Sequence, residues 1–309
     1  MKDVCEAIET PEEIARLAAE PGPEERAAVL PDMPREDYDR LDRVNWSRLK
    51  HLLRSPAHYR QALLAQRPDS DAMKRGRAVH LAVLEPERFA VECVVWRGGR
   101  RAGKEWERFA QENSEREILT ENEHDLCLAI AAAVQGRKDA ARYLTRGRSE
   151  VTVKWAQKSA DLGAVPGWEF DCKGRLDFVS GAGVLVDLKT TRDASPDGFA
   201  KEVWKHRYHT QVAWYADGYE AATGRALPFV LVAVETEAPH VVQVYRVPDE
   251  ILELGREEYR ALLERLAQCR RENSWSGYAE EEMALTLPRW AVPRLDDDDV
   301  TDLDLVIGE

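Results

Sequence analysis

The stretch GVLVDLKTTRD, residues 183–193, begins as an apolar strand and then introduces two charges, Asp187 and Lys189. Residues i and i+2 of a strand point to the same face, so this carboxylate and this ammonium emerge side by side. Burying charge is costly unless the charge is paired or binds a metal. A bare pair of this kind is typical of a surface salt bridge on an edge strand. At the end of an apolar strand it also indicates a catalytic site.

The preceding segment, KGRLDFVSGAG at residues 173–183, brings another carboxylate to the same place. Its GAG is a tight-turn sequence, so a hairpin can bring Asp177 beside Asp187. Two adjacent carboxylates repel each other unless one takes a proton, and a hard divalent cation removes this conflict. We therefore expect Mg²⁺ here, with Mn²⁺ able to substitute. Lys189 would hold an attacking water or stabilise charge on phosphorus.

Hydrophobic periodicity predicts helices, three strands, helices, two strands and a final helix, in that order. Helical spacing covers 45–66 with a break at Ser55-Pro56, 71–84, 121–145, 197–222 in two pieces, and roughly 250–272 after an N-cap at Asp249. Strand patterns cover 150–156, 168–179, 184–189, 229–236 and 240–247. This order predicts an α/β (α+β) fold with a mixed central sheet, flanking helices and a helical N-terminal layer. The first three strands should be antiparallel neighbours.

Composition divides the chain into three expected parts. They are a partly irregular arm at 1–40, a single domain at 41–275 with a helical layer (41–148) and a sheet core (149–275), and an acidic tail at 276–309. The net charge is −13, of which −8 lies in residues 280–309, whereas residues 43–104 carry +9. A basic segment within an acidic chain can bind phosphates, although an ordinary solvated helical surface has the same composition.

Several protein classes find no support in the sequence. No run approaches the ~20 apolar residues of a membrane span, and the first residues lack an apolar signal core, so we expect a cytoplasmic protein with no membrane partner. The five cysteines are scattered and form no CxxC, which leaves zinc ribbons, iron–sulfur ligation and a disulfide framework unsupported. A P-loop is also absent from the sequence, so ATP-driven unwinding is not encoded.

The motifs together resemble the PD-(D/E)XK nuclease superfamily, within it the RecB-like and YqaJ-like branch, and most closely the RecE-type exonucleases (exodeoxyribonuclease VIII). Six segments follow one another in the family order: MPREDYDRLDRVNWSRLKHLLRSPAHY, MKRGRAVHLAVLEPERF, RAGKEWERF, CKGRLDF, VDLKTTRDA and YHTQVAWYADGY. The first acidic motif is here Gly-Arg-Leu-Asp, a form that the RecB-like branch tolerates. The resemblance implies a nuclease core in which a helix, three strands, a helix and two further strands follow in order.

The resemblance assigns roles to the hairpin residues. Asp177 and Asp187 would be metal ligands, Lys189 the catalytic lysine, and the Leu188 backbone carbonyl a further ligand. Gln211 would hold this lysine or a phosphate, as in the Gln-x-x-x-Tyr motif of the branch. Asp177 and Asp187 are therefore expected to serve both catalysis and metal binding.

Other residues have weaker support. His80 would be a metal ligand by resemblance, whereas a histidine within AVHLAV is by itself typical of a helical core. Glu150 resembles an extra acidic residue near the metal, or is an exposed residue at a strand end. Gly76 would let its helix approach DNA or the sheet. Tyr215 would lie at the DNA strand or pack in the core.

Basic residues form the expected DNA-binding set, which consists of Arg75, Arg97, Arg100, Arg101 and Lys104. The loop at 97–104 would contact backbone phosphates or a terminal 5′-phosphate, which gives affinity without sequence specificity. The alternative is an ordinary surface loop. Arg175, within GRLD, could instead brace the acidic site.

The resemblance implies a Mg²⁺-dependent 5′→3′ exonuclease acting on the ends of linear double-stranded DNA. It would leave 3′ single-stranded overhangs for recombination by a single-strand annealing protein (RecT-like), and would work as a homo-oligomer, often a tetrameric ring. Two alternatives keep the fold: an endonuclease or flap or single-strand nuclease, and a non-catalytic DNA-binding scaffold. The acidic tail is either a solubilising end, a docking peptide for the annealing protein, or a DNA mimic.

Overall fold

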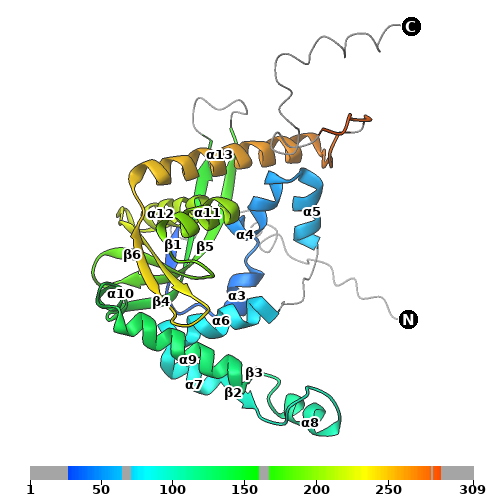
Figure 1. Ribbon diagram of the computed structural model, residues 1–309. Coiled ribbons are helices and arrows are strands. Elements are labelled where there is room, and N and C mark those ends of the chain that lie inside the picture. Colours follow the sequence, from blue (N-terminus) through cyan, green and yellow to red (C-terminus); the bar gives the residue numbers. More distant parts are fainter. Residues whose placement is uncertain (1–26, 65–70, 160–166, 280, 287–309) are drawn as a thin grey trace, which may run out of the picture.

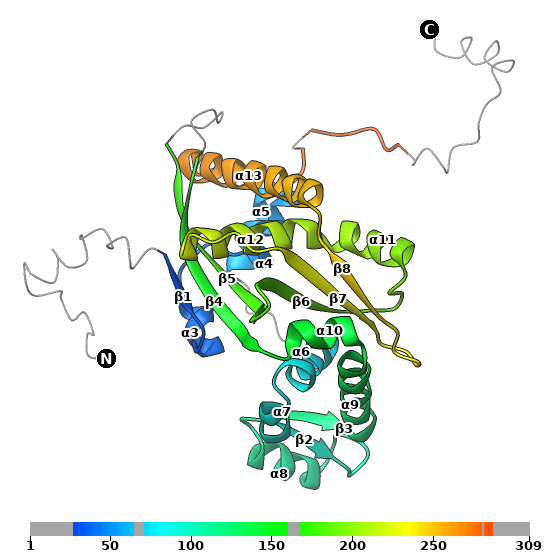
Figure 2. The same ribbon diagram turned by 90° about the vertical axis from the view of Figure 1, so that its left-hand side faces the viewer.

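Six strands form the central sheet: β1 (Ala28–Leu30), β4 (Gly147–Lys158), β5 (Glu169–Ser180), β6 (Val184–Thr191), β7 (Phe229–Glu235) and β8 (Val242–Arg246). They lie in the spatial order β1-β4-β5-β6-β7-β8. Figure 1 shows the sheet within the whole chain, and Figure 2 labels all six strands. Neighbouring strands are antiparallel except for the parallel pair β6 and β7. The computed structural model describes residues 27–64, 71–159, 167–279 and 281–286. The mixed sheet confirms the predicted fold class and the antiparallel order of β4, β5 and β6.

Helices cover both faces of this sheet (Figure 2). One layer contains α4 (Trp46–Leu49), η1 (Lys50–Leu53), α5 (Pro56–Leu64), α11 (Pro196–His206), α12 (Tyr208–Thr223) and α13 (Asp249–Glu272). The other contains α6 (Asp71–Leu84), α7 (Pro86–Glu92), α9 (Glu121–Gly136) and α10 (Lys138–Leu144). Alternate residues of β7 enter each core, Leu231 on the α12 side and Val232 on the α6 side. Burial on both faces explains the continuous apolar run of this strand.

The β5–β6 hairpin turns at residues 181–183 and separates early. Its paired residues run from Ser180 with Val184 to Phe178 with Val186. The next residues along the two strands are Asp177 and Asp187, which lie where the strands begin to separate. Because β6 pairs with β7 on its other side, only its β5 side is left open here.

Close packing fixes α12 between the sheet and α13. A Cβ on Gly218 would lie 2.5 Å from the Trp155 ring, and one on Gly255 would lie 2.4 Å from the His209 carbonyl oxygen. Trp155 also meets Trp214 edge to face at 5.0 Å between ring centroids. These contacts leave α12 little freedom, and α12 carries part of the candidate site.

A second, two-stranded sheet lies beyond α9, at one end of the protein (Figure 2). Strand β2 (Cys93–Trp96) pairs in parallel with β3 (Glu117–Thr120), and α8 (Lys104–Glu112) lies between them in sequence. The loop predicted at 97–104 joins β2 to α8. The two strands were not predicted, because four-residue strands give too short a pattern to separate from loop. Helix α8 was not predicted either.

Part of the arm that was predicted to be partly irregular is regular, since β1 pairs with β4 and α3 (Arg35–Arg40) buries Tyr38. Two local predictions were wrong. The helix predicted over 121–145 is two helices, because Arg137 leaves the helical conformation at ψ 107° after Gly136, a weak helix former. Pro248, not Asp249, is the N-cap of α13, and Asp249 lies in its first turn.

Residues 1–26 and 287–309 hold most of the predicted arm and most of the acidic tail, and they lie outside the described residues. The division of the chain into arm, domain and tail stays a prediction. Among the helices of the described ranges, none has both the length and the apolar character needed to cross a bilayer.

Candidate active site

Asp177 lies where β5 and β6 separate. Its Oδ2 accepts the backbone N–H of Leu188 at 2.9 Å, and Nδ1 of His80, on α6, lies 3.5 Å from the same oxygen. The N–H and C=O of one strand residue point to the same side, so the Leu188 carbonyl also faces β5. The structure thus brings together His80 of α6, Asp177 of β5 and Leu188 of β6, although α6 is far from the two strands in sequence.

Lys189 is held by three neighbours at the end of β6. Its Nζ lies 2.5 Å from Oδ2 of Asp187, donates to Oε1 of Gln211 at 3.0 Å, and lies 4.5 Å from the ring centroid of Tyr208. Burial lowers the pKa of a lysine, but the carboxylates of Asp187 and Asp177 together outweigh it, and the pKa of Lys189 is raised. The ammonium is therefore charged and oriented at neutral pH.

The Asp187 carboxylate is buried, with 1% of the residue exposed. Apart from the ion pair with Lys189, neither of its oxygens has a hydrogen-bond partner among the described residues. A buried carboxylate normally has its oxygens satisfied, and a bound cation would supply what is missing. Asp187 is the predicted ligand whose surroundings most directly indicate a cation.

Glu150 completes a group of three potential ligands with His80 and Asp177. Their ligand atoms all lie within 4.8 Å of one another. In the β4–β5 ladder, Ser149 pairs with Phe178 and Val151 pairs with Leu176, so Glu150 lies opposite Asp177. The backbone of Glu150 is in the left-handed region, with φ 52°. Carboxylate oxygens with one imidazole suit Mg²⁺ or Mn²⁺, so the residues present fit a divalent cation. Asp187 lies outside this group and is directed at Lys189.

The shared site changes the acidity of Asp177. Burial first, and then the neighbouring Asp187 charge, raise the pKa of the Asp177 carboxyl to about 7, although His80 and Lys189 act in the opposite direction. Without a cation, Asp177 therefore keeps a proton under mildly acidic conditions. This is the conflict between two carboxylates that the sequence predicted.

A hydrogen-bond chain links Lys189 to α12. Gln211 accepts from Lys189 through Oε1 and donates through Nε2 to the Tyr215 hydroxyl at 3.2 Å. A Cβ on Gly174 would lie 2.9 Å from the Tyr215 ring, so the glycine gives this ring its place beside β5. Burial raises the pKa of Tyr215 well above its ordinary value, and it stays a neutral phenol. The predicted Gln211–Lys189 contact is present in the structure.

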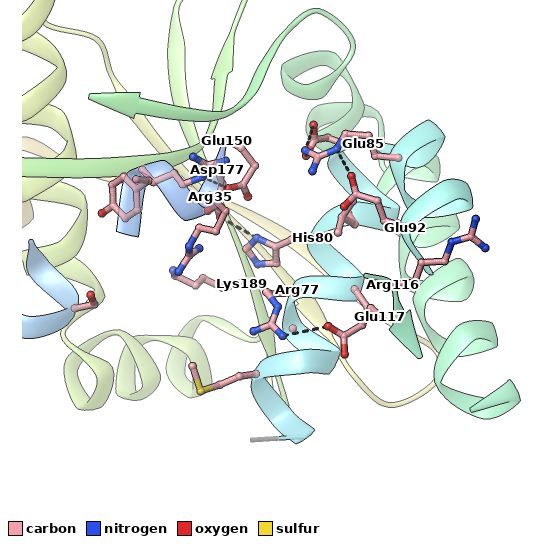
Figure 3. Close-up of a pocket in the computed structure, with 18 of the residues that line it drawn as sticks. Arg35, Arg77, His80, Glu85, Glu92, Arg116, Glu117, Glu150, Asp177 and Lys189 are labelled. Carbon is pink, nitrogen blue, oxygen red and sulfur yellow. Dashed lines mark hydrogen bonds and ion pairs between the residues drawn. The ribbon is translucent and has the colours of Figure 1, made fainter. Parts of the chain in front are cut away.

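A cavity of about 880 Å³ opens onto these groups (Figure 3). One face of α6 forms a wall, through Met73, Gly76, Arg77, His80 and Leu81. These positions share a helix face by their spacing. A Cβ on Gly76 would meet nothing within 4 Å, so Gly76 faces open space and does not bring α6 against the sheet. The predicted role of Gly76 in bringing α6 close to the sheet is therefore wrong. Its position at the cavity fits the other predicted role, an approach of α6 to DNA.

The predicted basic loop lies away from this cavity. Arg97, Arg100, Arg101 and Lys104 are not among its lining residues, and Arg75 is exposed on α6 outside it. Arg97 and Arg101 also pair with Glu121 at 3.7 Å and Glu123 at 3.2 Å. The DNA-binding role of this set stays a prediction.

Five other arginines line the cavity: Arg175, and four that the sequence analysis did not select, namely Arg35, Arg77, Arg88 and Arg116. Arg77 could have been found, because it lies three residues before His80 on the same helix face. Arg175 had been assigned a bracing role, and its Nε donates to Glu150 Oε2 at 2.6 Å. Arg35 gave no local signal, since α3 contacts the site only through the tertiary fold.

Residues 45–286 match the family described as a PDDEXK-like domain of unknown function (DUF3799). The match covers most of the chain, and the protein therefore belongs to this family. The family description and the fold agree with the predicted PD-(D/E)XK superfamily.

Two proteins are described among the solved structures that match the chain. A presumed exonuclease from Eubacterium rectale shares 15% identity over 83% of this chain and 96% of its own, with a TM-score of 0.56. The second, SSO0001, shares 13% identity over 70% of this chain and 84% of its own, and its TM-score of 0.27 is too low to carry an argument. No curated protein matches the sequence. The first likeness supports the fold alone.

Proposed function

We propose that the protein is a metal-dependent nuclease that hydrolyses phosphodiester bonds in DNA. The observation that carries the proposal is the convergence of His80, Glu150 and Asp177 beside the Asp187–Lys189 pair, in a cavity open to solvent. Acidic and imidazole ligands next to a fixed ammonium are the groups that phosphoryl hydrolysis requires. Membership of a PDDEXK-like family points to the same chemistry.

In this proposal, His80, Glu150 and Asp177 hold the cation, with the Leu188 carbonyl directed to the same side. Asp187 is a further ligand on the strength of the sequence resemblance and of its unsatisfied carboxylate oxygens. When bound, the cation lowers the pKa of a coordinated water and offsets charge on the leaving oxygen. Lys189 orients the attacking water and stabilises the negative charge that develops on the phosphoryl oxygens. Gln211 fixes the Lys189 side chain, and Tyr215 fixes Gln211 in turn.

At the finer level we propose a 5′→3′ exonuclease acting on linear double-stranded DNA, leaving 3′ overhangs for recombination. The support is the sequence resemblance to RecE-type enzymes, together with the similarity of fold to a presumed exonuclease. A single-strand annealing partner and a ring-shaped homo-oligomer belong to the same proposal and rest on the resemblance alone.

Linear and covalently closed circular DNA separate an exonuclease from an endonuclease. With Mg²⁺, we expect the protein to degrade linear duplex from its 5′ ends and to leave closed circles intact. Cutting of the closed circles would contradict the exonuclease assignment. Release of label from the 3′ ends first would contradict the polarity.

A further inference from the structure

Lys173 is a buried lysine that holds the end of helix α3. Only 1% of the residue is exposed, and its Nζ donates to the carbonyl oxygens of Tyr38 at 2.5 Å and Leu41 at 2.8 Å. The same nitrogen lies 4.4 Å from the Tyr38 ring centroid. A buried ammonium usually has an acidic partner, yet the ion pairs found in the described ranges include none for Lys173. The carbonyl dipoles at the end of α3 therefore compensate its charge.

Arg175 holds the other end of the same helix. Its Nη1 donates to the Met33 carbonyl oxygen at 2.9 Å, just before α3 begins, and to Thr152 Oγ1 at 3.1 Å. Lys173, Arg175 and Asp177 are alternate residues of β5. The strand that carries a metal ligand thus also fixes α3 at both of its ends.

Helix α3 presents Arg35 to the substrate cavity. The Arg35 side chain is 64% exposed. Among the described residues, one of its five N–H groups is used, because Nε donates a hydrogen bond to Oδ2 of Asp39 on the same helix. Figure 3 shows it on the same side of the cavity as Glu150, Asp177 and Lys189. Its remaining donors are available for the planar, bidentate contact that arginine makes with phosphate.

Arg35 also lies where two cavities join. A second cavity, of about 720 Å³, extends between residues 31–35, the end of α6 and the start of β4. The two cavities share the lining residues Arg35, Glu85, Arg88, Glu150 and Arg175. A DNA strand that reaches the metal ligands through the first cavity can continue past Arg35 into the second.

We propose that α3 is a clamp for the DNA strand, in which Arg35 contacts a backbone phosphate next to the scissile one and Lys173 is the positioning residue that holds Arg35 in place. The clamp rests on the proposed nuclease function, because its ligand is the substrate of that site. Neither residue was assigned a role from sequence.

A double-mutant cycle tests the clamp. Arg35→Gln, Lys173→Met and the double variant are titrated with a short, fluorescently labelled DNA duplex, with Ca²⁺ in place of Mg²⁺. Each single change is expected to weaken binding about tenfold, and Arg35→Gln to reduce the slope of log K against log salt concentration by about 1. Because Lys173 acts through Arg35, the double variant should bind DNA only slightly more weakly than Arg35→Gln alone. The matched control is Arg40→Gln, on the same helix but outside both cavities, which should bind as the wild type does.

Unfolding curves accompany the cycle, because Lys173→Met removes the hydrogen bonds that Nζ donates to the Tyr38 and Leu41 carbonyl oxygens. If this variant does not fold, Lys173→Arg replaces it, and a guanidinium too bulky for the site should still weaken binding. Fully additive losses, or an Arg35→Gln variant that binds like Arg40→Gln, would overturn the clamp. A wild-type protein that never cuts DNA, but whose binding still depends on Arg35, would overturn the nuclease function and leave the clamp standing.

Discussion

Glu150 stands opposite Asp177 across the β4–β5 ladder, and it does so with a left-handed backbone, φ 52°. A glutamate in this conformation carries a backbone cost of about 1 kcal/mol or more, which persists only where surrounding contacts impose it. The Glu150 side chain is in contact with Arg175, whose Nε lies 2.6 Å from Glu150 Oε2. The ion pair with Arg175 holds the Glu150 carboxylate beside Asp177 and His80.

Glu150→Gln is therefore expected to weaken divalent-cation binding about tenfold or more, because it keeps the shape of the side chain and removes its charge. Titration calorimetry with Mn²⁺ measures this directly. Glu169→Gln is the control, since Glu169 lies at the far end of β5 and outside the cavity. Equal Mn²⁺ affinity for Glu150→Gln and the wild type would remove Glu150 from the ligand set.

Lys189→Met is expected to lower the cleavage rate about 100-fold or more, because the group that stabilises charge on phosphorus is lost. It should also destabilise the metal-free protein by roughly 3 kcal/mol, since Asp187 is left buried without its partner. Adding Asp187→Asn should recover much of this stability and none of the activity. Urea unfolding and a cleavage assay separate the two effects. If Lys189→Met were as stable as the wild type, the ion pair with Asp187 would contribute no stability, and this prediction would be wrong.

Gly174→Ala tests the chain from β5 to the lysine. The new methyl group would lie 2.9 Å from the Tyr215 ring and displace it, and Gln211 and Lys189 with it. We expect a cleavage rate about tenfold lower, with Mn²⁺ affinity unchanged, because a small misplacement of a fixed group is costly to catalysis. Gly136→Ala is the control, since that position has open space, and it should leave activity unaltered. Normal cleavage by Gly174→Ala would show that Tyr215 does not position the lysine.

Cation binding should depend on pH through Asp177. Its pKa is about 7 in the folded, metal-free protein, above the ~3.9 of an unfolded aspartate. Between about pH 4 and pH 7 the Asp177 carboxyl therefore keeps a proton in the folded state that it loses in the unfolded state. The contribution of Asp177 to the free energy of unfolding falls as pH rises through this range. A cation must displace that proton, so affinity should rise about tenfold per pH unit up to about pH 7 and then level off.

Mn²⁺ titrations in two buffers of different ionisation enthalpy measure the proton release. About one proton should be released per cation at about pH 6, and Asp177→Asn should abolish the release together with most of the binding. Proton release that is unchanged by Asp177→Asn would place the titrating group elsewhere.

The catalytic hairpin was predictable because its information is local. The GAG turn brings Asp177 and Asp187 together within eleven residues, and helical spacing places Gln211 and Tyr215 on one face of α12. The rest of the site depends on distant contacts. Lys173 reaches the Tyr38 carbonyl across 135 residues, and no pattern around either residue indicates that contact.

The same distinction explains the errors in the fold. The long strands and α6 have clear periodicity and were predicted close to their observed bounds. Strand β1 has three residues and becomes a strand only because β4 offers it an open edge. Strands β2 and β3 pair in parallel across α8, so neither four-residue segment signals its partner.

The central claim is that this site cuts DNA with a bound cation, and digestion of end-labelled linear duplex tests it most directly. The wild type and Asp187→Ala are compared with Mg²⁺ and with EDTA. The account predicts 5′-mononucleotides from the wild type with Mg²⁺ alone, and none from Asp187→Ala or with EDTA. Equal digestion by wild type and Asp187→Ala, or digestion that continues in EDTA, would contradict it.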